Sequence, residues 1–296
     1  MNSASQPLWR SLLYFPAHVS RFVEKAATCA ADALILDLED SVPFASKRDA
    51  RDGLAAAVPM LRAAGRDVLV RANGPLDLLV PDLRAAVQAG VHGVVLPKVR
   101  GGSHVEAIDE LLATLEEDAG AAPGSTRVVA IIETPRAFQA MDRIARASSR
   151  VVAMMLGGAD FALNCESGTG ADVLRVPKQL LIIAARAAGI LPLGLIDGLD
   201  ELRDVEAFER CARASAALGY AGATCIHPLQ VDALNRAFRP DENAVRDARA
   251  VLCAYDDARA NGRGALRIDG RMVDAAGVAQ ATRVLARDAA VRARAR

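Results

Sequence analysis

The stretch VVAIIETPRAFQAMDRIARASSRVVAMMLGGAD, residues 128–160, decides the fold of this chain. It begins and ends with short apolar runs, residues 128–132 and 151–156, and the segment between them is rich in Ala and Arg. Runs that are apolar on both faces are typical of strands in a parallel sheet that is covered by helices. We therefore interpret residues 128–160 as a strand, a helix and a second strand parallel to the first.

The same alternation recurs eight times along the chain. The apolar runs lie at residues 12–16, 33–38, 68–72, 93–97, 128–132, 151–156, 190–195 and 222–226. Eight consecutive strand–helix units fit a closed barrel, and no Gly-x-Gly-x-x-Gly motif opens the first helix as in a dinucleotide-binding open sheet. We predict an α/β protein whose main domain is a (β/α)₈ TIM barrel.

The segments between the strands have the spacing of amphipathic helices. In residues 50–61, for example, Leu54, Val58 and Leu61 form one apolar stripe and Arg51 lies opposite. Glycines follow several of these segments where a left-handed residue would end a helix: Gly65, Gly90, Gly189 and Gly219. These glycines are predicted to mark the boundaries between units.

The chain continues beyond the eighth predicted strand. Residues 242–260 have the pattern of a helix, and Asp-Gly at 269–270 between residues 266–268 and 271–273 is typical of a two-residue hairpin. A last Ala- and Arg-rich helix follows. We predict a catalytic barrel domain at residues 1–240 and a hairpin–helix extension at 241–296 that forms a lid over this active site or a neighbour's.

The composition excludes several classes of protein. Lys and Arg (36) balance Asp and Glu (36), which gives no field to attract nucleic acid or an anionic membrane. No apolar stretch is long enough for a membrane span, and the N-terminal residues lack a secretory signal pattern, so we expect a soluble, cytoplasmic protein. The five cysteines contain no Cys-x-x-Cys pair, and we interpret them as free thiols.

Polar residues end most of the predicted strands. The carboxyl ends of all barrel strands face the same side, where barrel enzymes have their active sites, so these residues should converge on one pocket. They are Asp37, Glu39 and Asp40 after the second strand, Arg71 and Asn73 after the third, Lys98 after the fourth, Glu133 after the fifth, Asp160 after the sixth and His227 after the eighth. Whether His227 faces a ligand or packs inside the protein stays open.

Glu133 and Asp160 follow consecutive strands and are the predicted metal ligands. Carboxylate oxygens suit Mg²⁺ or Mn²⁺, which keep coordination positions open for water and substrate. The alternative is that one carboxylate pairs with Arg71 or Lys98 and the other caps a helix. Two glycines precede Asp160 and a Thr-Pro pair follows Glu133, and such turns let an anionic ligand approach the backbone, which favours the metal site.

Arg71 is the predicted cation of the site. Its guanidinium is suited to bind a substrate carboxylate with two parallel hydrogen bonds or to stabilise an oxyanion. A salt bridge to Asp37 or Glu39 is the alternative, and the two interpretations are compatible. Because three acids crowd together here, at least one should pair with Arg71 or Lys98, so we assign Asp37 and Glu39 to the catalytic site as supporting groups. A Schiff base on Lys98 is disfavoured, since a metal pair nearby makes it redundant.

Several segments, read in order, carry a resemblance to a known family. They are RSLLYFPA (10–17), DALILDLEDSVP (32–43), LVRANG (69–74), GVVLPKV (93–99), IIETPRAF (131–138), GGADFAL (157–163), LGYAGATCIHPLQVDALN (218–235) and GRMVD (270–274). Together they resemble the citrate lyase β-subunit-like (HpcH/HpaI aldolase) family over nearly the whole chain. The similarity is greatest to its branch of CoA-ester lyases.

The resemblance implies a barrel whose C-terminal extension is exchanged between the subunits of a trimer or hexamer. It implies Mg²⁺ on Glu133 and Asp160, and a catalytic acid/base at Asp274 that reaches a neighbouring subunit's site. From the residues alone, Asp274 is instead a helix N-cap. The residues that the resemblance places at the substrate are Arg71, Lys98, Glu133, Gly158 and Ala159.

The implied reaction is the Mg²⁺-dependent cleavage or formation of a 3-hydroxy-3-carboxyacyl-CoA, such as malyl-CoA, citramalyl-CoA or citryl-CoA. The products of cleavage are an acyl-CoA and a 2-oxo acid, with Asp274 protonating the thioester enolate. The sequence departs from the family pattern at Pro16-Ala17, at residues 175–178 and around Asp197, which leaves the substrate open. The alternatives are a metal-dependent aldolase for free 2-oxo acids without CoA, and a non-catalytic subunit of a lyase complex.

Overall fold

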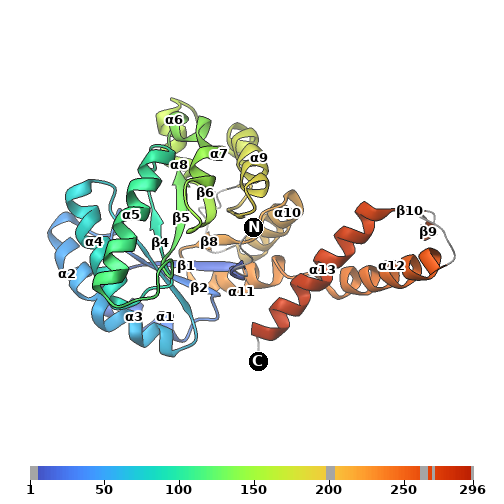
Figure 1. Cartoon of the computed structure of the whole chain (residues 1–296), viewed down its shortest axis with the longest axis horizontal. Coiled ribbons are helices and arrows are strands. Elements are labelled where there is room, and N and C mark those ends of the chain that lie inside the picture. The colour runs from blue at the N-terminus through green and yellow to red at the C-terminus, as the bar shows by residue number, and fades with distance from the viewer. Residues whose placement is uncertain (1–5, 198–203, 261–265, 269–270, 295–296) are drawn as a thin grey trace. The chain divides into compact units, whose positions relative to one another are not determined.

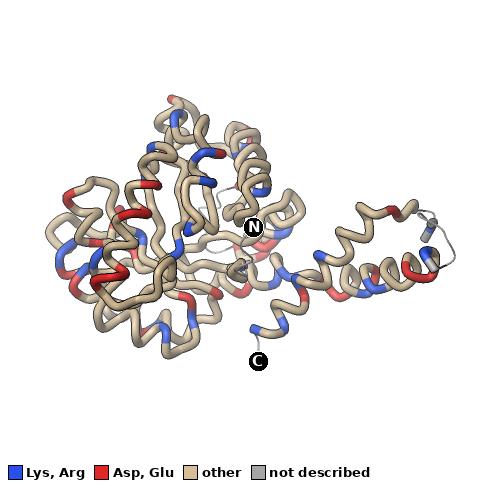
Figure 2. The backbone as a smooth tube through the Cα atoms, viewed as in Figure 1, with Lys and Arg blue, Asp and Glu red and all other residues tan. Residues whose placement is uncertain are grey.

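The structure is a computed structural model that describes residues 6–197, 204–260, 266–268 and 271–294 (Figure 1). The chain divides into two compact units, Met1–Arg236 and Ala237–Arg296. Lys and Arg, like Asp and Glu, are distributed over helices of both units, and the two charges are equal in number (Figure 2).

Eight parallel strands form the centre of the first unit. They are β1 (Ser11–Pro16), β2 (Ala33–Asp37), β3 (Asp67–Arg71), β4 (Gly93–Leu96), β5 (Arg127–Ile132), β6 (Val151–Leu156), β7 (Leu191–Leu193) and β8 (Ala223–Cys225). Their order in the sheet is β7-β6-β5-β4-β3-β2-β1-β8, so each strand from β1 to β7 neighbours the next along the chain. The predicted (β/α)₈ barrel is confirmed.

The barrel closes between β7 and β8 through few backbone contacts. A single bridge pairs Leu193 with Gly222, and the amide of Gly194 donates to the carbonyl of Gly222 at 2.9 Å. The strands are shorter here than the predicted runs 190–195 and 222–226. Gly194 turns the backbone out of the strand with a φ of 149°, and a Cβ at Gly222 would lie 1.8 Å from the carbonyl oxygen of Trp9.

Helices cover the outside of this sheet. They are α1 (Ser20–Ala27), α2 (Lys47–Asp52), α3 (Leu54–Ala63), α4 (Leu76–Ala89), α5 (Gly102–Asp118), α6 (Pro135–Gln139), α7 (Met141–Arg146), α8 (Gly158–Asn164), α9 (Ala171–Ala187), α10 (Val205–Leu218) and α11 (Pro228–Ala237), with a 3₁₀ turn at Phe44–Ser46. The four glycines predicted to end helices all have positive φ, between 75° and 119°.

The helix predicted at residues 50–61 is in fact two helices, α2 and α3, which meet at Gly53. The apolar stripe of Leu54, Val58 and Leu61 is buried as predicted. Arg51 forms a 2.7 Å ion pair with the fully buried Asp82 of α4. The charged residue opposite the stripe, Arg51, therefore connects α2 to α4.

The centre of the barrel is filled by apolar side chains from most of its strands. The cluster includes Leu12, Ile35, Leu69, Val95, Val129, Ile131, Ala153, Met155, Leu191 and Leu193, and Trp9 packs with them. Since every second residue of a strand points inward, these side chains alternate with others that pack under the helices. The closely packed interior confines polar chemistry to the ends of the strands.

The second unit contains α12 (Glu242–Ala260), β9 (Leu266–Ile268), β10 (Arg271–Val273) and α13 (Ala275–Arg294). The two strands are antiparallel and α12 packs along α13, so the predicted strands of the hairpin and the two helices are present. The predicted turn at residues 269–270 lies outside the described residues. The assignment of residues 241–296 as a lid stays a prediction. Within the described part of the chain, no helix has both the length and the apolar character needed to cross a bilayer.

Candidate active site

Arg71 and Asp37 form an ion pair at the carboxyl ends of two neighbouring strands. The two residues are partners in the parallel register of β2 and β3. The guanidinium donates from Nε and from Nη2 to the two carboxylate oxygens, each at 2.7 Å. It also lies 5.0 Å from the centre of the Tyr14 ring of β1. The salt bridge considered from the sequence is therefore present, and it fixes the orientation of the guanidinium.

Glu39 connects this pair to Lys98. Its Oε1 accepts a hydrogen bond from Lys98 Nζ at 2.6 Å, and its Oε2 lies 3.1 Å from Arg71 Nη1. Burial raises the pKa of Glu39, and the two cations limit that rise. Burial also favours the neutral form of Lys98, but its hydrogen bond to Glu39 and the negative charges of the surrounding acids together outweigh burial and raise the pKa of Lys98. A protonated amine is a poor nucleophile, which further disfavours a Schiff base.

Glu133 lies at the end of β5 and is buried, with 4% of its surface exposed. The backbone amide of Lys98 donates to its Oε2. Lys98 adopts a left-handed backbone with a φ of 52°, which is uncommon for a residue with a side chain. Burial, together with the charges of Glu39 and Asp160, raises the pKa of Glu133 to about 7. Three acids thus influence one another at this mouth of the barrel.

Asp160 lies in the first turn of α8, directly after Gly158 and Ala159. Asn164 of the same helix donates from Nδ2 to the backbone carbonyls of Glu133 (3.1 Å) and Asp160 (2.8 Å). This amide therefore connects the backbones that carry the two predicted metal ligands. Sequence reasoning missed Asn164, although its position four residues after Asp160 places it on the same helix face.

The donor set fits a hard divalent cation. Two carboxylates on adjacent strands leave coordination positions open, as Mg²⁺ requires when substrate oxygens complete its shell. The mutual repulsion of Glu133 and Asp160 is also what a bound cation would relieve. In the described part of the chain, no group of three or more His, Cys, Asp or Glu side chains is arranged to hold a metal.

Two residues expected in the pocket are used elsewhere. Asn73 is buried, and its amide and Nδ2 both donate to Asp82 of α4, at 2.9 and 2.6 Å. The expectation that Asn73 joins the pocket was therefore wrong. Asp274 belongs to the second unit, where its Oδ1 accepts the amides of Ala276 and Gly277 at 3.0 Å and caps α13. This is the N-cap expected from the residues alone.

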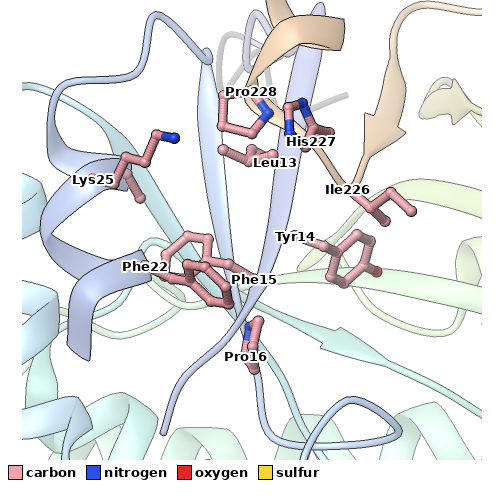
Figure 3. Close-up of a pocket in the computed structure, with 10 residues that line it drawn as sticks. Leu13, Tyr14, Phe15, Pro16, Phe22, Lys25, Ile226, His227 and Pro228 are labelled. Carbon is pink, nitrogen blue, oxygen red and sulfur yellow. The ribbon is translucent and has the colours of Figure 1, made fainter. Parts of the chain in front are cut away.

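A separate pocket of about 170 Å³ lies beside β1 and α1, and His227 is part of its wall. Figure 3 shows the Phe15 and Phe22 rings side by side, while the Tyr14 ring points away from them. Lys25 and His227 place polar atoms around this apolar surface (Figure 3). Sequence reasoning missed Phe22 as a pocket residue, because a single aromatic residue on an amphipathic helix usually packs into the core.

Comparisons with known proteins identify the family of the chain. The family model of HpcH/HpaI aldolase/citrate lyase matches residues 10–228. The chain belongs to this family. The family prediction is thus confirmed, and with it the expectation of a carbon–carbon lyase, since the relatives are lyases.

Three members of the HpcH/HpaI family show how far the similarity extends. The L-malyl-CoA/beta-methylmalyl-CoA lyase of Cereibacter sphaeroides is 36% identical over 300 residues and 92% of each chain. The citrate lyase subunit beta of Leuconostoc mesenteroides subsp. cremoris is 30% identical over 95% of this chain and 93% of that protein. The crystal structure of CitE from Mycobacterium tuberculosis in complex with magnesium, acetoacetate and coenzyme A has a TM-score of 0.75 and 32% identity. It covers 97% of this chain and 99% of CitE.

Proposed function

We propose that this protein is a Mg²⁺-dependent lyase that cleaves or forms a 3-hydroxy-3-carboxyacyl-CoA, with an acyl-CoA and a 2-oxo acid as the smaller partners. The observation that carries the proposal is the pair of carboxylates, Glu133 and Asp160, whose charges interact, at the barrel mouth where Glu39 contacts the guanidinium of Arg71. It is supported by the names of the relatives, which act on CoA esters or citrate, and by the magnesium and coenzyme A bound to CitE.

Each side chain then has a definite task. Glu133 and Asp160 hold Mg²⁺, or Mn²⁺ in its place, and the bound ion acts as a Lewis acid that stabilises charge on the substrate's oxygens. Arg71, held by Asp37, neutralises the substrate carboxylate or oxyanion. Lys98 is kept protonated by its hydrogen bond to Glu39, and its positive charge lies beside the same site.

We propose that the amides of Gly158 and Ala159 bind the carboxylate of the 2-oxo acid. Both lie in the first turn of α8, where a helix leaves amides without an intrahelical acceptor. Gly158 and Ala159 also line a cavity of about 530 Å³, which gives a ligand access to this turn. A carboxylate bound here lies next to Asp160, and hence next to the cation.

We further propose that the enzyme is a homo-oligomer, a trimer or a hexamer. Helix α9 exposes an apolar stripe of Val173, Val176, Leu180 and Ile183, which are between 44% and 63% exposed. Their spacing of three and four residues is that of a helix seam, and a second copy of the chain would cover it. In such an assembly Asp274 of a neighbouring subunit protonates the thioester enolate, or removes the proton in the condensation direction.

The test measures the cleavage of malyl-CoA, citramalyl-CoA and citryl-CoA with Mg²⁺ and compares it with the cleavage of aldols of free 2-oxo acids. Cleavage of at least one CoA ester is expected, and Glu133→Gln and Asp160→Asn should each reduce it by at least ~10²-fold. Asp118→Asn is the control, since Asp118 only joins an exposed ion pair with Arg84. Cleavage of the free aldols alone would replace the proposal by the CoA-independent aldolase. No cleavage of either substrate class would favour the non-catalytic subunit.

A further inference from the structure

Lys178 is a buried cation that the proposed reaction does not use. It lies on α9 with 8% of its surface exposed, and its Nζ donates to the carbonyl of Ile196 just after β7, at 3.1 Å. Burial lowers its pKa, while the charge of Asp197 works against that change. Among the described residues, no carboxylate lies within 4.0 Å of its ammonium group. Burial of an ammonium group is costly, so a carboxylate that forms a direct ion pair with it would be bound favourably.

The ammonium group adjoins a cavity that begins at the proposed substrate amides. This cavity of about 530 Å³ is bounded by Gly158 and Ala159 on one side and by Lys178, Asp197 and Tyr220 on the others. Because Asp160 directly follows Ala159, a 2-oxo acid held at the metal pair would extend its remaining substituent into this space. The substituent would then meet Lys178.

We propose that Lys178 determines substrate specificity by binding a second carboxylate on the oxo-acid half of the substrate. This inference rests on the proposed function. The three candidate oxo acids differ only in this substituent: glyoxylate has hydrogen, pyruvate has a methyl group and oxaloacetate has a carboxymethyl group. Only oxaloacetate supplies a second carboxylate that could form a direct ion pair with the buried ammonium group.

The remaining polar groups of the cavity fit this assignment. Burial raises the pKa of Tyr220, so its hydroxyl keeps its proton and is available as a neutral donor. Asp197 lies on the wall and would repel a carboxylate, so the site depends on Lys178 to overcome that repulsion. Removing the positive charge should therefore weaken the binding of a dicarboxylate more than that of a monocarboxylate.

The experiment measures the binding of freshly dissolved oxaloacetate and of pyruvate by calorimetry in Mg²⁺. We compare the native protein with Lys178→Met, which keeps the length and apolar stem of the side chain. The native protein should bind oxaloacetate at least ~10-fold more tightly than pyruvate. Lys178→Met should lose about 10- to 100-fold in oxaloacetate affinity and less than ~3-fold for pyruvate.

Arg175→Met is the matched control, because it removes a charge from the same helix at an exposed site, 54% accessible. It should change neither affinity. Thermal unfolding of Lys178→Met and of Lys178→Gln checks that the fold persists. The affinities of the native protein for oxaloacetate and pyruvate can be compared without any variant. The inference would be overturned if the native protein bound the two acids with equal affinity. It would also be overturned if Lys178→Met lost the same factor in affinity for both acids.

The outcome also separates this inference from the proposed function. If the oxaloacetate preference is present and depends on Lys178 but no CoA ester is cleaved, the proposed lyase activity is wrong and the specificity role stands. If citryl-CoA is cleaved and Lys178→Met lowers kcat/KM equally for citryl-CoA and citramalyl-CoA, the lyase stands and the specificity role is wrong.

Discussion

Gly157 lies so close to Glu133 that a Cβ on the glycine would be 2.5 Å from Cγ of the glutamate and 2.9 Å from its Oε1. The contact joins the end of β6 to the end of β5. Because Cγ is near the backbone, the glutamate cannot move aside by a small rotation of its carboxylate alone. The absence of a side chain at position 157 therefore determines where one of the proposed metal ligands lies.

We predict that Gly157→Ala displaces Glu133 and lowers the affinity for Mg²⁺ by at least ~10-fold, because a shift of about 1 Å suffices to spoil such a site. Mn²⁺ titration followed by calorimetry measures it. Gly168→Ala is the control, since a Cβ there would meet Val173 only at 4.0 Å. Unchanged affinity in Gly157→Ala would show that the carboxylate of Glu133 is not a ligand, or that it moves freely.

A second prediction concerns two neighbouring acids with different contacts to Arg71. Asp37 is buried and accepts two hydrogen bonds of 2.7 Å, whereas Asp40 is 61% exposed and lies 3.8 Å from the guanidinium. Asp37→Asn should lower kcat/KM by about 10- to 100-fold and stability by roughly 3 kcal/mol, since Arg71 loses the charged group that accepts both of these hydrogen bonds. Asp40→Asn should change stability by less than ~0.5 kcal/mol.

Steady-state kinetics and urea unfolding decide this comparison. If the two variants behave alike, the geometry of the Arg71–Asp37 pair has no special role. Restoration of activity in Asp37→Glu would also count against it, because a longer side chain cannot reproduce both hydrogen bonds from the same position on β2.

The third prediction tests whether Asp274 acts in a neighbouring subunit. Asp274→Asn should lower kcat by at least ~10²-fold with little change in KM, because it removes a proton donor and not a binding group. Arg71→Met should also be inactive, because it lacks the cation that neutralises the substrate carboxylate or oxyanion. When the two inactive variants are unfolded together and refolded as mixed oligomers, some sites contain both native residues, and part of the activity should return. If no activity returns from mixed oligomers of verified composition, Asp274 does not act between subunits.

A fourth prediction concerns stability at low pH. Glu116 of α5 is 1% exposed and accepts two hydrogen bonds from Arg150, at 2.6 and 2.8 Å. Burial alone would raise the pKa of Glu116, but the hydrogen bonds from Arg150 and from the amides of Thr126 and Gly124 outweigh it and lower the pKa from 4.5 to about 2. A lowered carboxyl pKa in the folded state stabilises the fold above pH 4.5, and this stabilisation is lost as the pH falls through 2.

The free energy of unfolding should therefore fall by about 3 kcal/mol between these limits from this group alone. Glu116→Gln should be less stable than the native protein by a similar amount at pH 7, and the difference should shrink toward pH 2. Urea unfolding over the pH series measures it. Asp118→Asn, two residues away in an exposed ion pair, should show no such trend.

The positions of the strands and of the acids at their ends could be read from the sequence. Strand runs are local patterns, and the rule that strand ends converge holds for any barrel, so Glu133, Asp160, Arg71 and Lys98 could be named without a structure. The ends of β7 and β8 could not be read in this way. The close approach of the Trp9 carbonyl to Gly222, just before β8, brings together residues far apart in the chain.

The sequence by itself determined the barrel, the family and the candidate metal pair, because these follow from periodicity, strand order and the chemistry of side chains at known positions. Only the tertiary structure decided which partner each polar group has. Asn73 donates to Asp82, and Lys178 lies buried beside a cavity and donates to a backbone carbonyl. The physical reason is that the cost of burying a polar group depends on neighbours brought in from other strands and helices, and no local pattern records them.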